Sequence, residues 1–347
     1  MRSLCSVVLL ALVFAIIPQY SRAAEVESIP DSYAMPATMI QIADGPRLNL
    51  RCSGSGERVV LFEAGGNADS SAWYRVLPML QGHARVCAYD RAGFGFSDEG
   101  ALPRDLDARV ADLHKLVRAA EFTAPIILVG HSLGSNIVRR YAEKFPGQVQ
   151  GLVLVDPPEQ GPDESMPESW RQADAAMLAQ RNSLLAACEE AAVAGQLDPA
   201  APPLQNCLRA PPPWMGERVV AAVRKNKLKP AFWRTLRSEL AQNERIFSQP
   251  VSESENLGAI PLILLSAGEP YRGVADDVRV ALETSRRHTH DRILGASTRS
   301  KEIKVEGASH DIPMERPGAI AAAVKEIVTM SAELESQKKA TPGVEPL

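Results

Sequence analysis

The stretch Gly130-His131-Ser132-Leu133-Gly134 is a G-x-S-x-G pentapeptide and is the most informative pattern in this chain. The residues before it, Pro125-Ile126-Ile127-Leu128-Val129, form a short apolar run that predicts a buried strand. After it, apolar residues recur at helical spacing until Pro146-Gly147 ends the predicted helix. Strand, sharp turn and helix are the context in which such a pentapeptide presents its serine as a nucleophile.

The remainder of the chain alternates between predicted strands and helices. A hairpin joined by Asp44-Gly45-Pro46 opens the pattern, which indicates an α/β fold with an eight-stranded, mostly parallel sheet covered on both faces. Besides the strand before Gly130, we predict strands at 37–42, 47–52, 58–62, 84–89, 151–155, 260–266 and 302–305. The main helices between them are predicted at 73–80, after 105, after 132, at 276–293 and after 317.

The alternation breaks between residues 157 and 258. This stretch holds helical segments at 170–192, 216–225 and 231–247, separated by proline-rich loops. We interpret it as a helical cap inserted between two core segments, residues 24–156 and 259–335. Residues 336–347 are polar and are expected to form a flexible tail.

The first 23 residues have the pattern of a signal peptide. Arg2 precedes an apolar run over 4–17, and Ser21-Arg22-Ala23 is a small-x-small cleavage site. We expect cleavage after Ala23 and a secreted or periplasmic protein with no membrane insertion afterwards. An uncleaved anchor is the alternative, although the run is short for a membrane span.

The net charge bears on the class of partner, and the cysteines bear on disulfides and metal sites. The formal net charge is −4, and signal cleavage would remove two basic residues and no acidic one. This argues against nucleic acid or an anionic membrane as a partner. Four of the five cysteines would remain, with spacings that fit no zinc site; they are either disulfide-bonded or free and buried.

A serine nucleophile needs a base, and the sequence offers six histidines. His310 alone lies in a predicted loop directly after a strand, within Glu306-Gly307-Ala308-Ser309-His310-Asp311. It also follows Ser132 in the chain, the order in which a nucleophile elbow and its base occur. We therefore predict Ser132 as nucleophile and His310 as base.

Several stretches together resemble the α/β-hydrolase superfamily, and its small esterase-like members with a helical cap in particular. They appear in the family's order between residues 37 and about 330: 61–67, 89–97, 130–134, 152–156 and 307–310. The resemblance implies the fold described above and a Ser–His–acid triad. The serine at the elbow argues against the haloalkane dehalogenase and epoxide hydrolase branches, which use an aspartate there.

The acid of the triad has two candidates. Many family members carry it after the strand that follows the cap, where this chain has Ser266-Ala267-Gly268-Glu269-Pro270 and offers Glu269. Others carry it one strand earlier, where this chain offers Asp156. We favour Asp156, because a short acid at a strand end needs less side-chain ordering, and Glu269 stays open.

The resemblance also predicts an oxyanion hole and two disulfides. Its backbone donors would be Leu133, directly after the nucleophile, and Gly66, in the loop after the third strand. The family's sheet order places the second and fourth strands side by side, which makes a Cys52–Cys87 bridge plausible. Cys188 and Cys207 both lie in the cap and are the second candidate pair.

We therefore expect a serine hydrolase that cleaves a small or medium carboxylic ester through an acyl-enzyme intermediate, without cofactor or metal. Lactone, amide or carbon–carbon bond hydrolysis by the same triad is an alternative. A non-catalytic ligand-binding protein on the same fold is another. The expected partner is an ester-like small molecule, and the sequence leaves the oligomeric state open.

Overall fold

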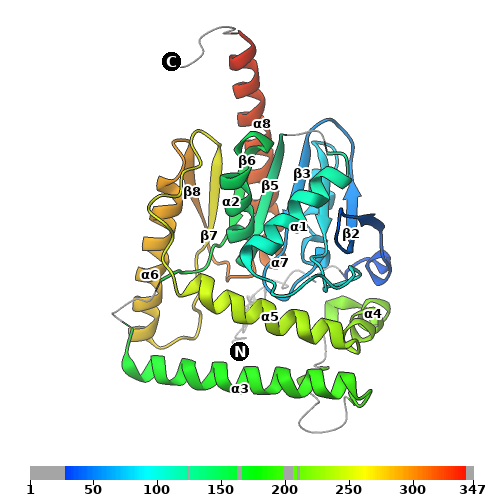
Figure 1. The fold of residues 1–347 in the computed structure, drawn as a ribbon. Coiled ribbons are helices and arrows are strands. Elements are labelled where there is room, and N and C mark those ends of the chain that lie inside the picture. Colours follow the sequence, from blue (N-terminus) through cyan, green and yellow to red (C-terminus); the bar gives the residue numbers. More distant parts are fainter. Residues whose placement is uncertain (1–27, 123–124, 162–165, 199–205, 209–211, 341–347) are drawn as a thin grey trace, which may run out of the picture.

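The centre of the molecule is a single eight-stranded β-sheet (Figure 1), here described from a computed structural model. The residues described are 28–122, 125–161, 166–198, 206–208 and 212–340. The strand order in the sheet is β1-β2-β4-β3-β5-β6-β7-β8. The strands are β1 Thr38–Gln41, β2 Arg47–Ser53, β3 Val59–Glu63, β4 Arg85–Tyr89, β5 Ile126–His131, β6 Val149–Val155, β7 Leu262–Ala267 and β8 Ser300–Val305.

The sheet is mostly parallel, as predicted. β1 and β2 form the antiparallel hairpin, β2 also runs antiparallel to β4, and the pairs from β4 to β8 are parallel. All parallel strands therefore end along the same edge of the sheet. Loops that follow these strands meet at that edge, which is where ligands bind in open α/β sheets.

Helices cover both faces of the sheet (Figure 1). The helices are α1 Leu106–Ala119, α2 Leu133–Lys144, α3 Glu168–Val193, α4 Glu217–Lys227, α5 Pro230–Phe247, α6 Asp276–Gly295, α7 Ile312–Glu315 and α8 Pro317–Ala340. One face packs against α1, α2 and α6, and the other packs against α8. Each face of the sheet therefore has its own apolar core. Neighbouring residues of β3 point to opposite faces, with Leu61 in one core and Phe62 in the other, so consecutive positions of the strand are apolar.

The segment 73–80, predicted as one helix, instead forms two short 3₁₀ helices, η2 Ser70–Trp73 and η3 Leu77–Leu80. Pro78 has no N–H to donate back along a continuous helix, so the chain cannot extend one through this point. The apolar side chains of Trp73 and Leu80 are nevertheless buried against the sheet.

Three helices, α3, α4 and α5, lie between β6 and β7 in the chain and form what we call the helical insertion (Figure 1). Its long helices α3 and α5 pack together around a small apolar core that includes Leu185, Trp233 and Leu236. The insertion also contacts the loops after β3 and β4, because Glu239 of α5 bonds to residues of both. It therefore lies along the edge where the parallel strands end.

Both expected disulfides are present. Cys52 and Cys87 face each other in the register of β2 and β4, with their Cα atoms 4.1 Å apart. Cys188 of α3 bonds to Cys207, with a Cα separation of 5.7 Å. The first bridge joins two strands of the sheet and the second lies within the helical insertion.

The two ends of the chain are only partly described. The expected signal peptide, residues 1–23, lies outside the described residues. At the other end α8 continues to Ala340, further than the position at which the sequence predicts a flexible tail. None of the helices that the structure describes is long and apolar enough to span a membrane.

Candidate active site

Ser132 occupies a strained turn between β5 and α2, with φ of 51° and ψ of −122°. Its N–H donates to the Val155 carbonyl at 2.9 Å, which ties the turn to β6. A Cβ on Gly130 would lie 2.5 Å from the Gly134 carbonyl oxygen, and one on Gly134 would lie 2.5 Å from the Glu63 carbonyl oxygen. Both positions exclude a side chain, which is the physical reason for the G-x-S-x-G spacing.

His310 lies in the loop between β8 and α7. The Glu315 carboxylate accepts hydrogen bonds from the N–H and hydroxyl of Ser309, at 2.7 and 2.8 Å, and so fixes the loop. The His310 Nδ1 atom is 2.6 Å from Asp156 Oδ2. An ionised carboxylate only accepts, so Nδ1 carries the proton and the neutral ring keeps a free lone pair at Nε2.

Asp156 follows β6 directly and is almost fully buried. Its N–H donates to the Leu265 carbonyl at 2.7 Å, which holds the residue at the end of β7. While Oδ2 faces His310, Oδ1 accepts a hydrogen bond from the Ala267 N–H at 2.8 Å and another from Arg286. The carboxylate is therefore held by three donors from three different segments.

These donors decide the charge of Asp156. Burial raises the pKa of its carboxyl, but the hydrogen bond from His310 and the positive charge of Arg286 outweigh burial. The net result is a pKa below the usual aspartate range. Asp156 is thus a carboxylate at neutral pH, in the state that can orient an imidazole.

Glu269, the other candidate acid, does not contact His310. Its carboxylate accepts from Arg272 at 3.0 and 2.8 Å, and 53% of its side chain is exposed. Only its backbone N–H reaches the His310 loop, where it donates to the Ala308 carbonyl at 2.9 Å. The structure pairs His310 with Asp156 and leaves Glu269 in a surface ion pair.

His131, next to the serine, holds the His310 loop against the turn. Its Nε2 donates to the backbone carbonyl of His310 at 2.9 Å, and the two ring centroids are 4.9 Å apart. Burial, followed by the nearby charge of His310, lowers the pKa of His131 to about 4. The described residues Ser132 and His310 share no hydrogen bond, a contact that often forms only with substrate.

The loop after β3 lies against Ser132. A Cβ on Gly65 would be 3.5 Å from Ser132 Cβ. The Gly65 carbonyl accepts a hydrogen bond from Arg91 at 2.7 Å, so across the trans peptide the Gly66 N–H points the opposite way. This N–H makes no hydrogen bond to any described residue. Leu133 begins α2, and the first N–H groups of a helix have no partner within it.

A buried group of charged and polar residues holds this loop in place. It consists of Glu63, Tyr89, Arg91 and Glu239, and we call it the Arg91 cluster. Arg91 pairs with Glu63 at 2.8 Å and with Glu239 of α5 at 3.1 Å, and Tyr89 donates to Glu63. Burial favours a neutral arginine, but Glu239 and Glu63 outweigh it and raise the pKa of Arg91. Glu239 also accepts from the Asn67 N–H at 2.8 Å. The cluster therefore joins the loop to the helical insertion.

Sequence reasoning missed the Arg91 cluster and Arg286. A signal existed for two residues, since Glu63 and Arg91 are opposite charges placed where two apolar strands end. Arg286 lies on the charged helix α6 among other arginines, and nothing in its local sequence distinguishes it.

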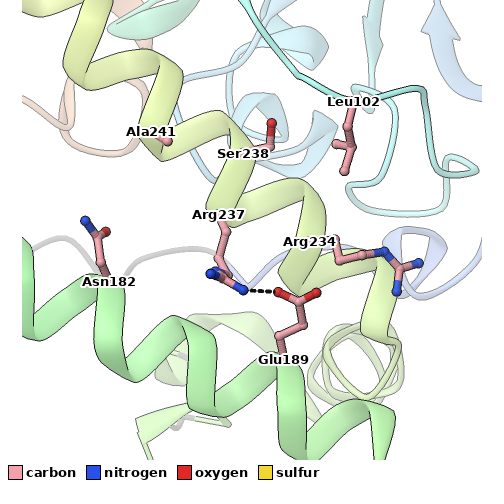
Figure 2. A pocket seen from close by; sticks show the side chains of 7 residues that line it. All are labelled: Leu102, Asn182, Glu189, Arg234, Arg237, Ser238 and Ala241. Atoms are coloured by element: carbon pink, nitrogen blue, oxygen red, sulfur yellow. Dashed lines mark hydrogen bonds and ion pairs between the residues drawn. The ribbon is translucent and has the colours of Figure 1, made fainter.

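A separate groove lies between α3 and α5 (Figure 2). Its charged side chains are paired: Arg237 bonds to Glu189 at 2.5 Å, and Arg234 to Glu99 at 2.8 Å. It shares no residue with the candidate site. Among the described residues no group of three or more His, Cys, Asp or Glu side chains is placed to hold a metal ion.

Comparison with known proteins identifies the family. Residues 58–317 match the alpha/beta hydrolase fold family, so the chain belongs to it. The chain is 36% identical over 105 residues to the 2-hydroxy-6-oxo-6-(2'-aminophenyl)hexa-2,4-dienoic acid hydrolase of Metapseudomonas resinovorans, which is 30% of this chain and 36% of that one. It spans about two fifths of the length of the curated relatives it matches first.

Solved structures of hydrolases share the fold at low identity. An epoxide hydrolase, CorEH, superposes with a TM-score of 0.60 at 18% identity, covering 84% of this chain and 97% of that one. A thermophilic esterase from Thermogutta terrifontis gives 0.55 at 19% identity, with 85% and 99% covered. At these identities the likeness concerns the fold, and the reaction has to be argued from the site.

Proposed function

We propose that this protein is an exported serine hydrolase that cleaves a small or medium carboxylic ester through an acyl-enzyme. The observation that carries the proposal is the 2.6 Å bond between His310 Nδ1 and Asp156 Oδ2, beside the strained turn that presents Ser132. Nucleophile, base and orienting acid are the three groups that acyl transfer by a serine requires.

In the proposed acylation step, Ser132 Oγ attacks the ester carbonyl carbon while His310 Nε2 takes the hydroxyl proton. Asp156 keeps the proton on Nδ1 and stabilises the imidazolium that forms. The N–H groups of Gly66 and Leu133 donate to the oxyanion. The carbon–oxygen bond then breaks, and His310 gives its proton to the leaving alcohol.

Deacylation repeats these steps with water. His310 removes a proton from the water that attacks the acyl-enzyme, and the proton returns to Ser132 Oγ as the acid leaves. The free Gly66 N–H, aimed away from Arg91, supports its role as the second oxyanion donor.

Apolar side chains near the site support an organic acyl or alcohol group as substrate. Trp214 of the insertion stacks on Tyr74 at 5.6 Å, and Met314 of α7, four residues after His310, packs in the same cluster. Met166 and Trp170 form a second apolar cluster with α6. We propose that the insertion acts as a cap over Ser132 and His310 and that these apolar side chains line the substrate site.

Export from the cytoplasm is part of the proposal. Two disulfides support an oxidising compartment, secreted or periplasmic, since such bonds persist there and are rare in the cytosol. The signal peptide expected at residues 1–23 would provide the route.

Lactone, amide or carbon–carbon bond hydrolysis is the alternative, because the same triad serves these reactions. The relationship to a hydrolase of a hexa-2,4-dienoic acid favours considering the carbon–carbon reaction. A panel of p-nitrophenyl esters of rising chain length, with a lactone, an amide and a vinylogous diketone, separates these substrates.

Labelling with a fluorophosphonate probe tests the nucleophile. We expect the wild-type protein to be labelled once, at Ser132, and the Ser132→Ala variant to remain unlabelled and inactive. Absence of labelling in a folded wild-type protein, or equal labelling of the variant, would reject a serine hydrolase and favour a non-catalytic binding protein.

Two matched substitutions test the acid. Asp156→Asn should lower kcat by about 10⁴-fold, because an amide stabilises the wrong imidazole tautomer. Glu269→Gln should leave kcat close to wild type, because its carboxylate pairs with Arg272 at the surface. Steady-state kinetics on the best ester decides between them, and a larger loss in Glu269→Gln would reassign the acid.

A further inference from the structure

The carboxylate of Asp156 has a second charged partner besides His310. Arg286 of α6 bonds to Oδ1, the oxygen that does not face the imidazole. Only 12% of the Arg286 side chain and 2% of the Asp156 side chain are exposed. This pair is shielded from water, so its interaction is stronger than that of a surface ion pair.

We propose that Arg286 is a positioning residue of the catalytic centre, which holds the Asp156 carboxylate and sets the pH at which His310 becomes available as a base. The inference rests on the proposed function, in which His310 accepts the proton of Ser132. It adds a fourth residue, a permanently charged arginine, that would act on the proposed triad through Asp156.

The geometry explains how Arg286 would act. It approaches Asp156 from α6, while His310 approaches from the loop after β8, so the carboxylate lies between the guanidinium and the imidazole. Without Arg286, the full negative charge of Asp156 would act on His310 and favour its protonated form. With Arg286 present, part of that charge is offset, and the imidazole loses its proton at lower pH.

Other ionisable groups lie around Arg286, Asp156 and His310. Most of them do not change protonation state between pH 5 and 8. His131 has a pKa of about 4, and burial, then the neighbouring Glu159, raises the pKa of Tyr271 well above its usual value, so both stay neutral between pH 5 and 8. The hydrogen bond to His290 lowers the pKa of Glu302 to about 2, with Arg286 contributing. Burial raises the pKa of Asp311, which lies beside His310.

The alternative is that Arg286 only anchors α6 to the sheet. Three variants distinguish the two roles: Arg286→Gln keeps a hydrogen-bond donor and removes the charge, and Arg286→Lys keeps the charge. Arg292→Gln is the matched control on the same helix, since Arg292 pairs with the exposed Glu253. The measurement is kcat/KM for the best ester against pH, with thermal unfolding as the check on folding.

We expect the acid limb of the Arg286→Gln profile to move to higher pH by about one unit, the size of a charge effect across a partly shielded site. Arg286→Lys and Arg292→Gln should keep the wild-type midpoint. A folded Arg286→Gln protein with an unmoved midpoint overturns the proposal, as does an Arg286→Lys protein that shifts as far as Arg286→Gln.

A second variant covers the case in which Arg286→Gln does not fold. Glu302 faces Arg286 from β8 and is 41% exposed, so Glu302→Gln should fold. Removing its negative charge should move the acid limb slightly to lower pH. An unchanged or raised midpoint would contradict the proposal.

Failure of this inference and failure of the proposed function are distinguishable. Hydrolysis that depends on Ser132 supports the function whatever Arg286 does. If no ester is cleaved, the NMR titration of the His310 ring in wild type and Arg286→Gln still reports the influence of Arg286, and equal midpoints would reject it.

Discussion

At the scale of single residues, the site combines a strained serine with a histidine that is held at two points, its ring and its backbone. His310 binds Asp156 through Nδ1, and its backbone carbonyl is held by His131. Because His131 is neutral above about pH 5, it adds no positive charge next to the imidazolium of the proposed mechanism. His131, next to the proposed nucleophile, is thus a structural hydrogen-bond donor, and its titration affects stability.

We predict that His131 makes the fold acid-sensitive. Its pKa falls from 6.5 to about 4 on folding, so the unfolded chain binds more protons between these values. Stability from His131 is therefore full above pH 6.5 and is lost as the pH falls to 4, by up to about 3 kcal/mol. His131→Gln keeps a donor that does not titrate.

Urea unfolding of both proteins between pH 4 and 7 provides the measurement. The unfolding free energy of wild type minus that of His131→Gln should fall by that amount at the acid end. Asp90, whose pKa burial raises to about 6, acts on both proteins and cancels in the difference. A difference independent of pH would contradict the assignment.

At the scale of elements, buried charged residues link the helical insertion to the loops that follow β3 and β4. Glu239 of α5 holds both Arg91 and the Asn67 N–H, next to the proposed oxyanion donor Gly66. Movement of α5 would therefore move the loop after β3. The Arg91 cluster therefore links the helical insertion to the loop that carries the proposed oxyanion donor, in contrast to a freely hinged lid.

We predict that Glu239→Gln loses both stability and catalytic rate. Removing one partner of a buried pair costs about 3–5 kcal/mol, and the loosened Gly66 donor should reduce kcat by up to about 10²-fold. Glu244→Gln is the control, because Glu244 lies on the same helix and pairs with Arg181 at the surface. Its stability should change by less than about 0.5 kcal/mol. Chemical denaturation and kcat on a folded sample measure both effects, and equal behaviour of the two variants would refute the coupling.

At the scale of the whole molecule, two disulfides stabilise different parts. The Cys52–Cys87 bridge closes a 35-residue separation within the sheet, and Cys188–Cys207 closes 19 residues within the insertion. From loop length, the two correspond to about 4 and about 3 kcal/mol of stabilisation. The first acts on the core that all other elements pack against, and the second acts on the insertion.

Paired alanine variants are expected to separate these effects. Cys52→Ala/Cys87→Ala should lower the global unfolding temperature and expose the whole sheet to hydrogen exchange. Cys188→Ala/Cys207→Ala should raise exchange mainly in α3 while the sheet stays protected. Identical exchange maps for the two variants would contradict this division.

Local patterns in the sequence predict the sheet, the sharp turn at Ser132 and the order of the candidate residues along the chain. They also predict Ser132 and His310 as site residues, because the glycine spacing and the apolar strands are each contained within a few residues. The single helix predicted at 73–80 is wrong for a local reason too: the apolar residues have helical spacing, but Pro78 interrupts the helix and the chain forms two short 3₁₀ helices instead.

Which of these groups come into contact depends on the tertiary fold. Asp156 and Glu269 both follow strands that end at the same edge, and their separate environments come from Arg286 and Arg272. Arg286 lies 130 residues from Asp156 in the chain. The pairing of such distant charges depends on sheet order and helix packing, which local patterns of residues do not encode.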